Sequence, residues 1–200
     1  MGIFERVSDW TGWELDGQQL LLLRRYADWL VSEAIPAGGL GPNEGERVIE
    51  RHIADALLFS AGWSPPGPPT RVVDLGSGVG LPGIPLAILW GDAEVILIER
   101  SGRRADLLRR AARVLGLANV AVRAEDAARV ELEADLVVAR AAADPGLVFE
   151  WGTRLIRPGG RIVIGGSHVE PPVPMEGEVI RAVPAGILDH PAWLRMMAPS

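Results

Sequence analysis

The stretch Arg71-Val-Val-Asp-Leu-Gly-Ser-Gly-Val-Gly-Leu-Pro-Gly83 decides the fold of this chain. Its apolar residues, Val72 to Leu75, predict a short buried strand, and the glycines and proline that follow predict a turn into a helix. Gly76, Gly78 and Gly80 carry no Cβ, so the backbone of this turn can approach a bound ligand closely.

The spacing within this turn separates two classes of cofactor. The turn has the pattern D-x-G-x-G-x-G, whereas the dinucleotide fingerprint is G-x-G-x-x-G and would need a glycine in place of Leu81. Asp74 precedes the glycines, where a carboxylate disfavours a pyrophosphate and suits a ligand with a cationic end. The pattern therefore favours S-adenosylmethionine over NAD, although such turns also occur simply to pack a helix against a strand.

Composition narrows the class of protein. With 200 residues, 48% of them hydrophobic, the chain is long enough for one domain with a small extension. The absence of cysteine excludes disulfides, thiolate metal sites and a cysteine nucleophile. We expect a cytoplasmic protein with no membrane contact, because no apolar run is long enough to span a bilayer and the N-terminal residues lack the basic-then-apolar order of a signal peptide. The net charge of −6 means that any nucleic-acid binding needs a local basic patch.

The first third of the chain predicts helices. Asp16 and Gln19 have the spacing of a capping box, and the apolar residues that follow recur at helical intervals. Asn43 and Glu46 repeat the capping-box spacing before a second helix. The expected elements are an irregular arm over residues 1–15, helices over 16–34 and 43–59, a loop over 35–42 and a proline-dense linker over 64–69. We therefore expect an N-terminal helical extension, residues 1–64, and one compact cofactor-binding domain, residues 65–200.

Strands and helices alternate in the remainder of the chain. Such alternation predicts an α/β fold with a doubly wound, mostly parallel sheet and right-handed crossovers. The expected strands are 72–75, 94–99, 120–124, 135–139 and 161–164, the helices are 83–89, 102–115 and 145–155, and a turn covers 157–160. Two further strands, 178–183 and 192–197, have no helix between them and predict an antiparallel hairpin at one edge of the sheet.

The candidate site lies where the parallel strands end, because ligands of open α/β sheets bind outside their carboxyl ends. Glu99 ends the second strand, where an acid can accept hydrogen bonds from both ribose hydroxyls. Arg140 ends the fourth strand and either faces the substrate or pairs with a carboxylate such as Asp74 or Glu125. The expected cofactor-binding residues are Asp74, Gly76, Ser77, Gly78, Gly80, Leu81, Glu99, Ala124 and Glu125.

Several segments together resemble a known family. They are Arg51-His-Ile-Ala-Asp-Ala-Leu57, the glycine turn with its extension Gly83-Ile-Pro-Leu-Ala87, and Ala139-Arg-Ala-Ala142. Over about residues 17–166 the chain resembles the glucose-inhibited division protein B family of S-adenosylmethionine-dependent methyltransferases, which modify N7 of one guanine in small-subunit ribosomal RNA. The resemblance implies a helical N-terminal cap on a class I methyltransferase (Rossmann-like) fold.

The reaction implied by this resemblance needs no general base, and the sequence offers no paired histidine or carboxylate motif that would supply one. N7 of guanine has a free lone pair, so the transfer needs alignment of the reactants and no general base. We expect Arg140 to position the substrate and Arg51, His52, Arg103 and Arg140 to bind the RNA or small ribosomal subunit. We also expect a monomer.

Two segments depart from the family pattern. The family carries Asn-Leu-Thr before the Arg-His helix, and residues 35–45 contain nothing similar; it ends strand five with Leu-Lys-Gly, where this chain has Ile164-Gly-Gly-Ser. Both segments are expected on the RNA side. Two other functions therefore stay open, a diverged methyltransferase acting on a small molecule and a non-catalytic protein that keeps the cofactor pocket.

Overall fold

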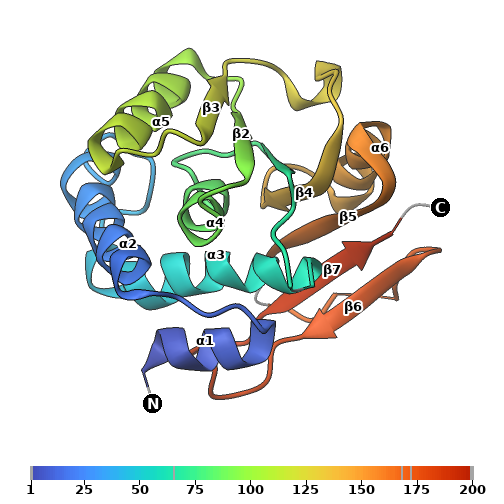
Figure 1. Cartoon of the computed structure of the whole chain (residues 1–200), viewed down its shortest axis with the longest axis horizontal. Helices are drawn as coiled ribbons and strands as arrows, with labels where there is room; N and C mark the ends of the chain where they lie inside the picture. Colours follow the sequence, from blue (N-terminus) through green and yellow to red (C-terminus); the bar gives the residue numbers. More distant parts are fainter. Residues whose placement is uncertain (1, 65, 168, 172, 199–200) are drawn as a thin grey trace.

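The computed structural model describes residues 2–64, 66–167, 169–171 and 173–198. Its centre is one seven-stranded sheet in the order β3-β2-β1-β4-β5-β7-β6 (Figure 1). Strands β1 to β5 are parallel, and β7 and β6 add an antiparallel hairpin beside β5. The strands are β1 Arg71–Leu75, β2 Glu94–Ile98, β3 Val120–Arg123, β4 Ala134–Arg140, β5 Ile156–Ser167, β6 Glu178–Ala182 and β7 Trp193–Met197. The expected α/β fold with its C-terminal hairpin is confirmed.

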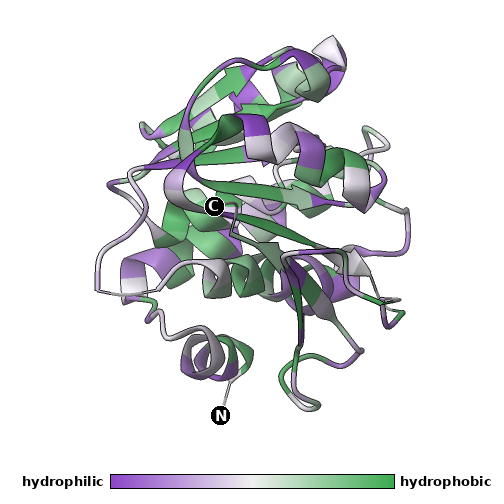
Figure 2. Ribbon diagram, turned by 90° about the vertical axis from the view of Figure 1, so that its right-hand side faces the viewer, coloured by the Kyte–Doolittle hydropathy of each residue, from purple (hydrophilic) through white to green (hydrophobic). Residues whose placement is uncertain are grey.

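Helices cover both faces of the sheet. The α-helices are α1 Ile3–Thr11, α2 Gly17–Trp29, α3 Asp55–Leu57, α4 Gly83–Leu89, α5 Gly102–Leu115 and α6 Pro145–Leu155. Short helical turns of other types are η1 Leu30–Ala34, η2 Gly45–Arg47, η3 Val48–Ala54, η4 Leu58–Gly62 and η5 Ala127–Arg129. Figure 2 shows apolar strands inside and helices whose polar residues face outward.

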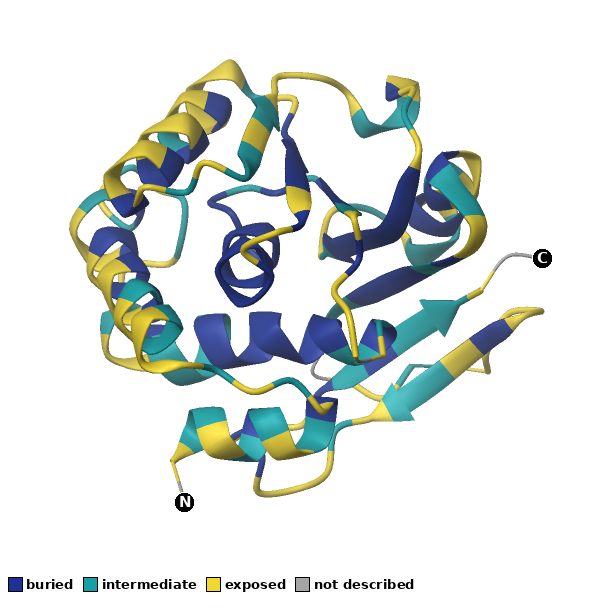
Figure 3. Cartoon of the chain, in the orientation of Figure 1, coloured by how far each residue is buried: buried dark blue, intermediate teal, exposed yellow. Residues whose placement is uncertain are grey.

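The two faces of the sheet support cores of different size. Successive residues of β1 point to opposite faces, as strand geometry requires. Val72 joins the larger core, which α2, α4 and α5 complete, whereas Val73 joins the smaller core under α6. All seven residues of α4 are buried, which Figure 3 shows as an almost uniformly dark helix in the middle of the molecule. This helix starts directly after the glycine turn, so the turn is held between two buried elements.

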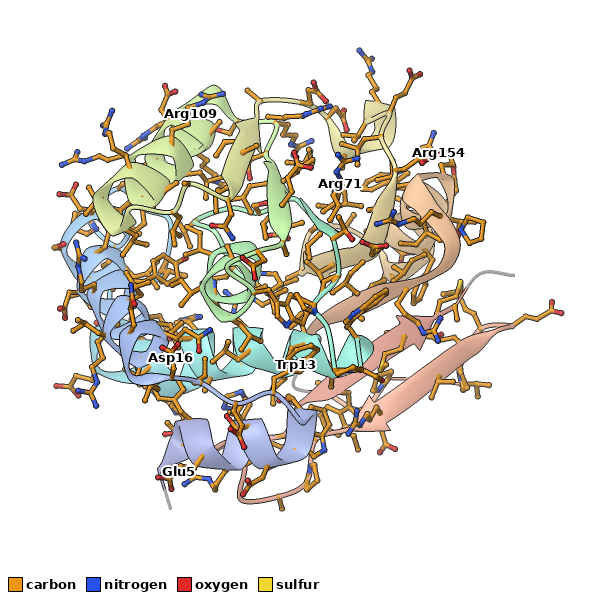
Figure 4. The ribbon with its side chains drawn as sticks, in the orientation of Figure 1. Glu5, Trp13, Asp16, Arg71, Arg109 and Arg154 are labelled. Carbon is orange, nitrogen blue, oxygen red and sulfur yellow. The ribbon has the colours of Figure 1, made fainter. Side chains whose placement is uncertain are left out.

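The N-terminal arm was predicted to be irregular, and this prediction was wrong. Residues 3–11 form α1, which ends at Gly12 in the left-handed conformation (φ 79°). The chain beyond it is fixed by Trp13, labelled in Figure 4, whose indole nitrogen donates to the carbonyl of Trp63 at 3.0 Å. The Trp13 ring also packs edge-on against Trp90, with centroids 5.4 Å apart. Apolar residues at positions 3, 4 and 7 already had helical spacing, which the aromatic and glycine content obscured.

The two longer N-terminal helices are present in modified form. The capping box of α2 is confirmed by reciprocal hydrogen bonds of 2.7 Å between Asp16 and Gln19. The expected helix 16–34 is regular only to Trp29 and continues as the π-helical turn η1. The expected helix 43–59 starts at Gly45 without a side-chain cap and is a succession of η2, η3, α3 and η4. The predicted capping box at Asn43 therefore does not form.

The turn predicted at residues 157–160 belongs instead to β5. This strand starts at Ile156, and its pairing with β4 shifts register between Ala134 and Leu136. Gly160 passes so close to β4 that an added Cβ would lie 2.7 Å from the carbonyl oxygen of Asp135. The expected domain boundary falls at residue 65, outside the described residues, so the division stays a prediction. No helix in the described part of the chain is long and apolar enough to cross a membrane.

Candidate cofactor and substrate site

Two neighbouring cavities lie at the carboxyl ends of the parallel strands. Strand order reverses between β1 and β4, the position at which open α/β sheets bind ligands. The polar cavity, of about 250 Å³, is lined by Gly76, Ile98, Glu99, Arg100, Arg104, Glu125, Asp126, Ala127, Ala141, Ala142, Ala143 and Trp151. The apolar cavity, of about 450 Å³, is lined by Ala141, Ala143, Pro145, Ile164, Gly165, Gly166, Val169, Glu170, Pro171, Trp193 and Arg195. Ala141 and Ala143, directly after β4, form a wall common to both.

Gly76 places the backbone of the glycine turn against the polar cavity. Its φ of 71° is a conformation that side chains disfavour, and an added Cβ would lie 2.6 Å from the Cβ of Ala142. The amides of Gly76 and Ser77 both donate to the carbonyl of Ile98 at 2.9 Å, which ties the turn to β2. The turn is therefore rigid, and it exposes bare backbone to the cavity.

Asp74 is a fully buried carboxylate at the base of this turn. Its Oδ2 accepts a hydrogen bond from the amide of Gly83 at 3.0 Å, whereas Oδ1 has no hydrogen-bond partner among the described residues. Burial raises the pKa of Asp74 from 3.8 to about 7, although the Gly83 amide opposes the shift. An orphaned acceptor on a carboxyl that is costly to ionise fits a site that receives a positive charge.

Glu99 connects β2 to the glycine turn and lines the polar cavity. Its Oε2 accepts from the amide of Gly78 at 3.0 Å and its Oε1 from the amide of Ser101 at 2.8 Å. Each carboxylate oxygen has a second lone pair, so the side chain can still accept from a ligand. The pairing of Glu99 with ribose hydroxyls stays a prediction, and the structure shows in addition that Glu99 holds two loops in place.

The remaining predicted cofactor residues divide into two groups. Glu125 lines the polar cavity from the end of β3, whereas Ala124 is exposed and does not reach it. Ser77, Gly78, Gly80 and Leu81 shape the turn and lie outside the cavity lining. The Ser77 hydroxyl donates to the carbonyl of Asp74 at 2.9 Å, and Leu81 is buried. Gly80 leaves room for Ile84 and for the hydroxyl of Tyr26.

Arg140 ends β4 and contacts a row of polar side chains from the N-terminal extension. Its Nη1 lies 3.3 Å from Oδ2 of Asp55 and 3.4 Å from Nδ1 of His52. The other ring nitrogen of His52 lies 3.0 Å from Glu44, which also pairs with Arg51 at 3.6 Å. Of the two alternatives left open for Arg140, the structure shows pairing with a carboxylate, and this is Asp55, only 4% exposed, and neither Asp74 nor Glu125.

Burial lowers the pKa of His52, and the positive charge of Arg140 lowers it further. The imidazole is therefore neutral near pH 7 and acts as a hydrogen-bonding link between Glu44 and Arg140. Sequence reasoning missed Asp55 and Glu44 as members of this site. Asp55 lies three residues after His52, a spacing that places both on one helical face and could have identified it.

Arg103 lies apart from the other predicted substrate residues. Its Nη2 donates to the carbonyl of Ala37 at 3.3 Å, and it lines neither cavity. Arg100 and Arg104, by contrast, line the polar cavity, as does Trp151 of α6. No group of three or more His, Asp or Glu side chains in the described ranges is arranged to hold a metal ion.

Comparison with known proteins gives one family. Residues 19–170 match the family model GidB, rRNA small subunit methyltransferase G. The Mycolicibacterium gilvum protein named ribosomal RNA small subunit methyltransferase G is 42% identical over 158 residues, covering 75% of this chain and 66% of that protein. The protein of the same name from Acidothermus cellulolyticus is 41% identical over 148 residues, covering 73% of this chain and 64% of that protein. The chain thus spans slightly less than two thirds of the length of these curated relatives.

Solved structures support the fold. A mutant of MtNAS in complex with S-adenosylmethionine superposes with a TM-score of 0.57 at 22% identity, covering 89% of this chain and 72% of that one. TrmN from Thermus thermophilus gives a TM-score of 0.53 at 23% identity, covering 72% and 49%. At these identities the likeness shows the class I methyltransferase fold alone.

Proposed function

The chain belongs to the ribosomal RNA small subunit methyltransferase G family, and we propose that it transfers a methyl group from S-adenosylmethionine to N7 of a guanine in small-subunit ribosomal RNA. The observation that carries this proposal is the polar cavity at the strand reversal. There Gly76 exposes bare backbone and Glu99 supplies a carboxylate, with the buried carboxyl of Asp74 directly behind the turn. These are the groups that a nucleoside with a cationic sulfur requires.

We infer that the chain's own residues bind and orient the cofactor. Glu99 and Glu125 accept hydrogen bonds from its hydroxyl and amino groups, and Gly76 lets it approach the backbone. Asp74, whose hydrogen-bond partners among the described residues include no cation, provides negative potential beneath it. When bound, the cofactor supplies an electrophilic methyl group.

The acceptor needs positioning and no proton transfer. N7 has an in-plane lone pair, so the rate depends on alignment. No general base is required, in keeping with a site whose histidine, His52, is already engaged by Glu44 and Arg140. Arg140 is held at the tip of β4, where it can bind the RNA backbone next to the acceptor.

Local basic residues compensate for the acidic net charge of the protein. Arg100 and Arg104 are exposed and line the polar cavity, and Arg51 lies on the N-terminal extension. Arginine contacts to phosphate release counterions, so RNA affinity should fall steeply with salt. We propose that the protein works in the cytoplasm as a monomer.

The second candidate function is methyl transfer to a small molecule. The net charge of −6 and the 450 Å³ apolar cavity beside the cofactor site favour it.

The test uses the purified chain, labelled S-adenosylmethionine and small ribosomal subunits from a strain that lacks the modification. We expect label in the RNA, its loss in Arg140→Ala, and retention in Arg109→Ala, an exposed arginine on the outer side of α5 (Figure 4). Tight S-adenosylmethionine binding with no transfer to the subunits would reject the RNA assignment. Calorimetric preference for NAD would reject methyl transfer altogether.

A further inference from the structure

The apolar cavity contains an arginine that the proposed reaction has not used. Arg195 comes from β7, opposite Ile164 of β5, and its side chain lines the cavity. Among the described residues that line this cavity, two are charged, Arg195 and Glu170. A guanidinium in an otherwise apolar wall is costly to bury unless something holds and neutralises it.

Glu178 on β6 holds Arg195 in one orientation. Its carboxylate is fully buried, engages Nε of Arg195, and accepts from Nη2 at 2.8 Å. This side-on pair occupies one edge of the guanidinium, and its two parallel bonds fix the plane of the group. Nη1 at the other edge donates to no acceptor within the described part of the chain. The Glu178 carboxylate also raises the pKa of Arg195, so the donor stays charged.

Trp193 lies on the same face of β7 as Arg195, because the two are separated by one residue. It is half-buried and lines the cavity, whereas Leu194 between them packs into the core on the opposite face. The cavity thus combines an aromatic ring, apolar walls and one fixed donor. Aromatic rings of this kind stack on nucleobases.

The cavity is also in the right place for a methyl acceptor. Ala141 and Ala143 form a wall of both cavities, so a base in the apolar cavity lies next to a ligand in the polar one. Gly165 of β5 lines the cavity without a side chain, and a Cβ added there would point into the core, 2.5 Å from the ring of Phe59. Arg195 is the one cation among the described residues that line this cavity.

We propose that the apolar cavity receives the acceptor base, that Trp193 stacks on it, and that Nη1 of Arg195 donates to O6 of guanine. This inference rests on the proposed function and adds the residue that selects the base. Adenine carries an amino donor where guanine carries O6, so the same arginine rejects adenine. Arg195 is thus a specificity-determining residue, and Glu178 is a positioning residue that acts through it.

The test measures base preference in binding, without methyl transfer. With S-adenosylhomocysteine saturating the polar cavity, guanosine and adenosine 5′-monophosphates are titrated, following the indole N–H signal of Trp193, assigned with Trp193→Phe. We expect wild type to bind the guanosine nucleotide about tenfold more tightly, from one charged hydrogen bond to the base. The double variant Arg195→Met/Glu178→Gln, which leaves no unpaired buried charge, should reduce this ratio to near one. Arg154→Met on α6, whose Nη2 donates to the carbonyl of Ala128, is the control and should keep it.

An unchanged preference in the double variant would overturn the assignment, as would a wild type that does not distinguish the nucleotides. The same double variant should lose its guanine preference while its affinity for S-adenosylmethionine stays within about twofold of wild type, since Arg195 is outside the polar cavity. A guanine preference in a protein that methylates no RNA would refute the proposed function and leave standing the contact of Arg195 with guanine.

Discussion

Replacing Asp74 with asparagine should remove a pH dependence of stability that this one carboxyl creates. Burial keeps the folded carboxyl protonated up to a pKa of about 7, whereas the unfolded chain releases the proton near 3.8. Between these values the unfolded state binds fewer protons, so the free energy of unfolding falls as the pH rises. The full gap corresponds to about 4 kcal/mol, of which about 3 kcal/mol is lost between about pH 5 and pH 8.

The assay is urea unfolding of the cofactor-free protein, followed by tryptophan fluorescence at both pH values. Wild type should lose about 3 kcal/mol more than Asp74→Asn between them, because every other titrating group is shared and cancels. Asparagine keeps an oxygen for the Gly83 amide, so the fold should survive the change. Parallel pH profiles for the two proteins would refute the reasoning, since they would show that Asp74 ionises as freely in the fold as in the unfolded chain.

Ionisation of Asp74 should make cofactor affinity rise with pH, whereas it makes the free energy of unfolding fall. A cationic ligand favours ionised Asp74, so wild-type affinity for S-adenosylmethionine should rise between about pH 6 and pH 8. Asp74→Asn should bind about 30-fold more weakly at the higher pH, as expected when one partner of a buried charge pair is removed. Calorimetry at the two pH values measures the affinity of wild type and variant. Equal affinity of wild type and Asp74→Asn at about pH 8 would contradict a role for this charge.

Three further changes test separate contacts. Gly76→Ala should destabilise the protein by about 1–3 kcal/mol and weaken cofactor binding, because the new Cβ would meet Ala142 at a positive φ. Thermal unfolding measures the stability and calorimetry the cofactor affinity. Unchanged values of both would contradict the close approach of Gly76 to Ala142. Glu99→Gln should lower cofactor affinity about tenfold while the fold is retained, because the amides of Gly78 and Ser101 lose their charged acceptor. Unaltered cofactor affinity would show that Glu99 does not belong to the site. Asp55→Ala should lower the free energy of unfolding in urea by about 3 kcal/mol and reduce methyl transfer, since Arg140 loses its buried partner. Asp55→Asn should recover part of the stability. Wild-type stability and activity of both variants would show that the pair is dispensable.

The sheet could be predicted from the sequence because its signals are local. Continuous apolar runs such as Val95 to Ile98 and the glycine turn after Leu75 fixed the strands and their order along the chain. Parallel alternation then required the carboxyl ends to meet, which placed Glu99 and Gly76 beside one cavity. The position of these residues followed from topology and needed no knowledge of side-chain packing.

The partner of Arg140 could not be predicted in this way. Asp55 and Arg140 are 85 residues apart and come from different elements, so only the packing of the extension on the sheet brings them to 3.3 Å. The same holds for Arg195 and Glu178, whose pairing depends on hairpin register. The interrupted helix over 43–59 shows a further limit, because the helical spacing of its apolar residues does not distinguish a regular α-helix from the succession of η2, η3, α3 and η4.

The most direct measurement of the central claim is nucleoside analysis of ribosomal RNA after reaction with the purified chain and S-adenosylmethionine. Small subunits from a strain lacking the modification are digested, and methylated nucleosides are identified by mass spectrometry. The account predicts 7-methylguanosine, at one residue per subunit, from wild type and from Arg109→Ala, and much less from Asp74→Asn at about pH 8 and a cofactor concentration near the wild-type Kd. Methyl groups on another base or atom, or no product from a wild type saturated with cofactor, would contradict it.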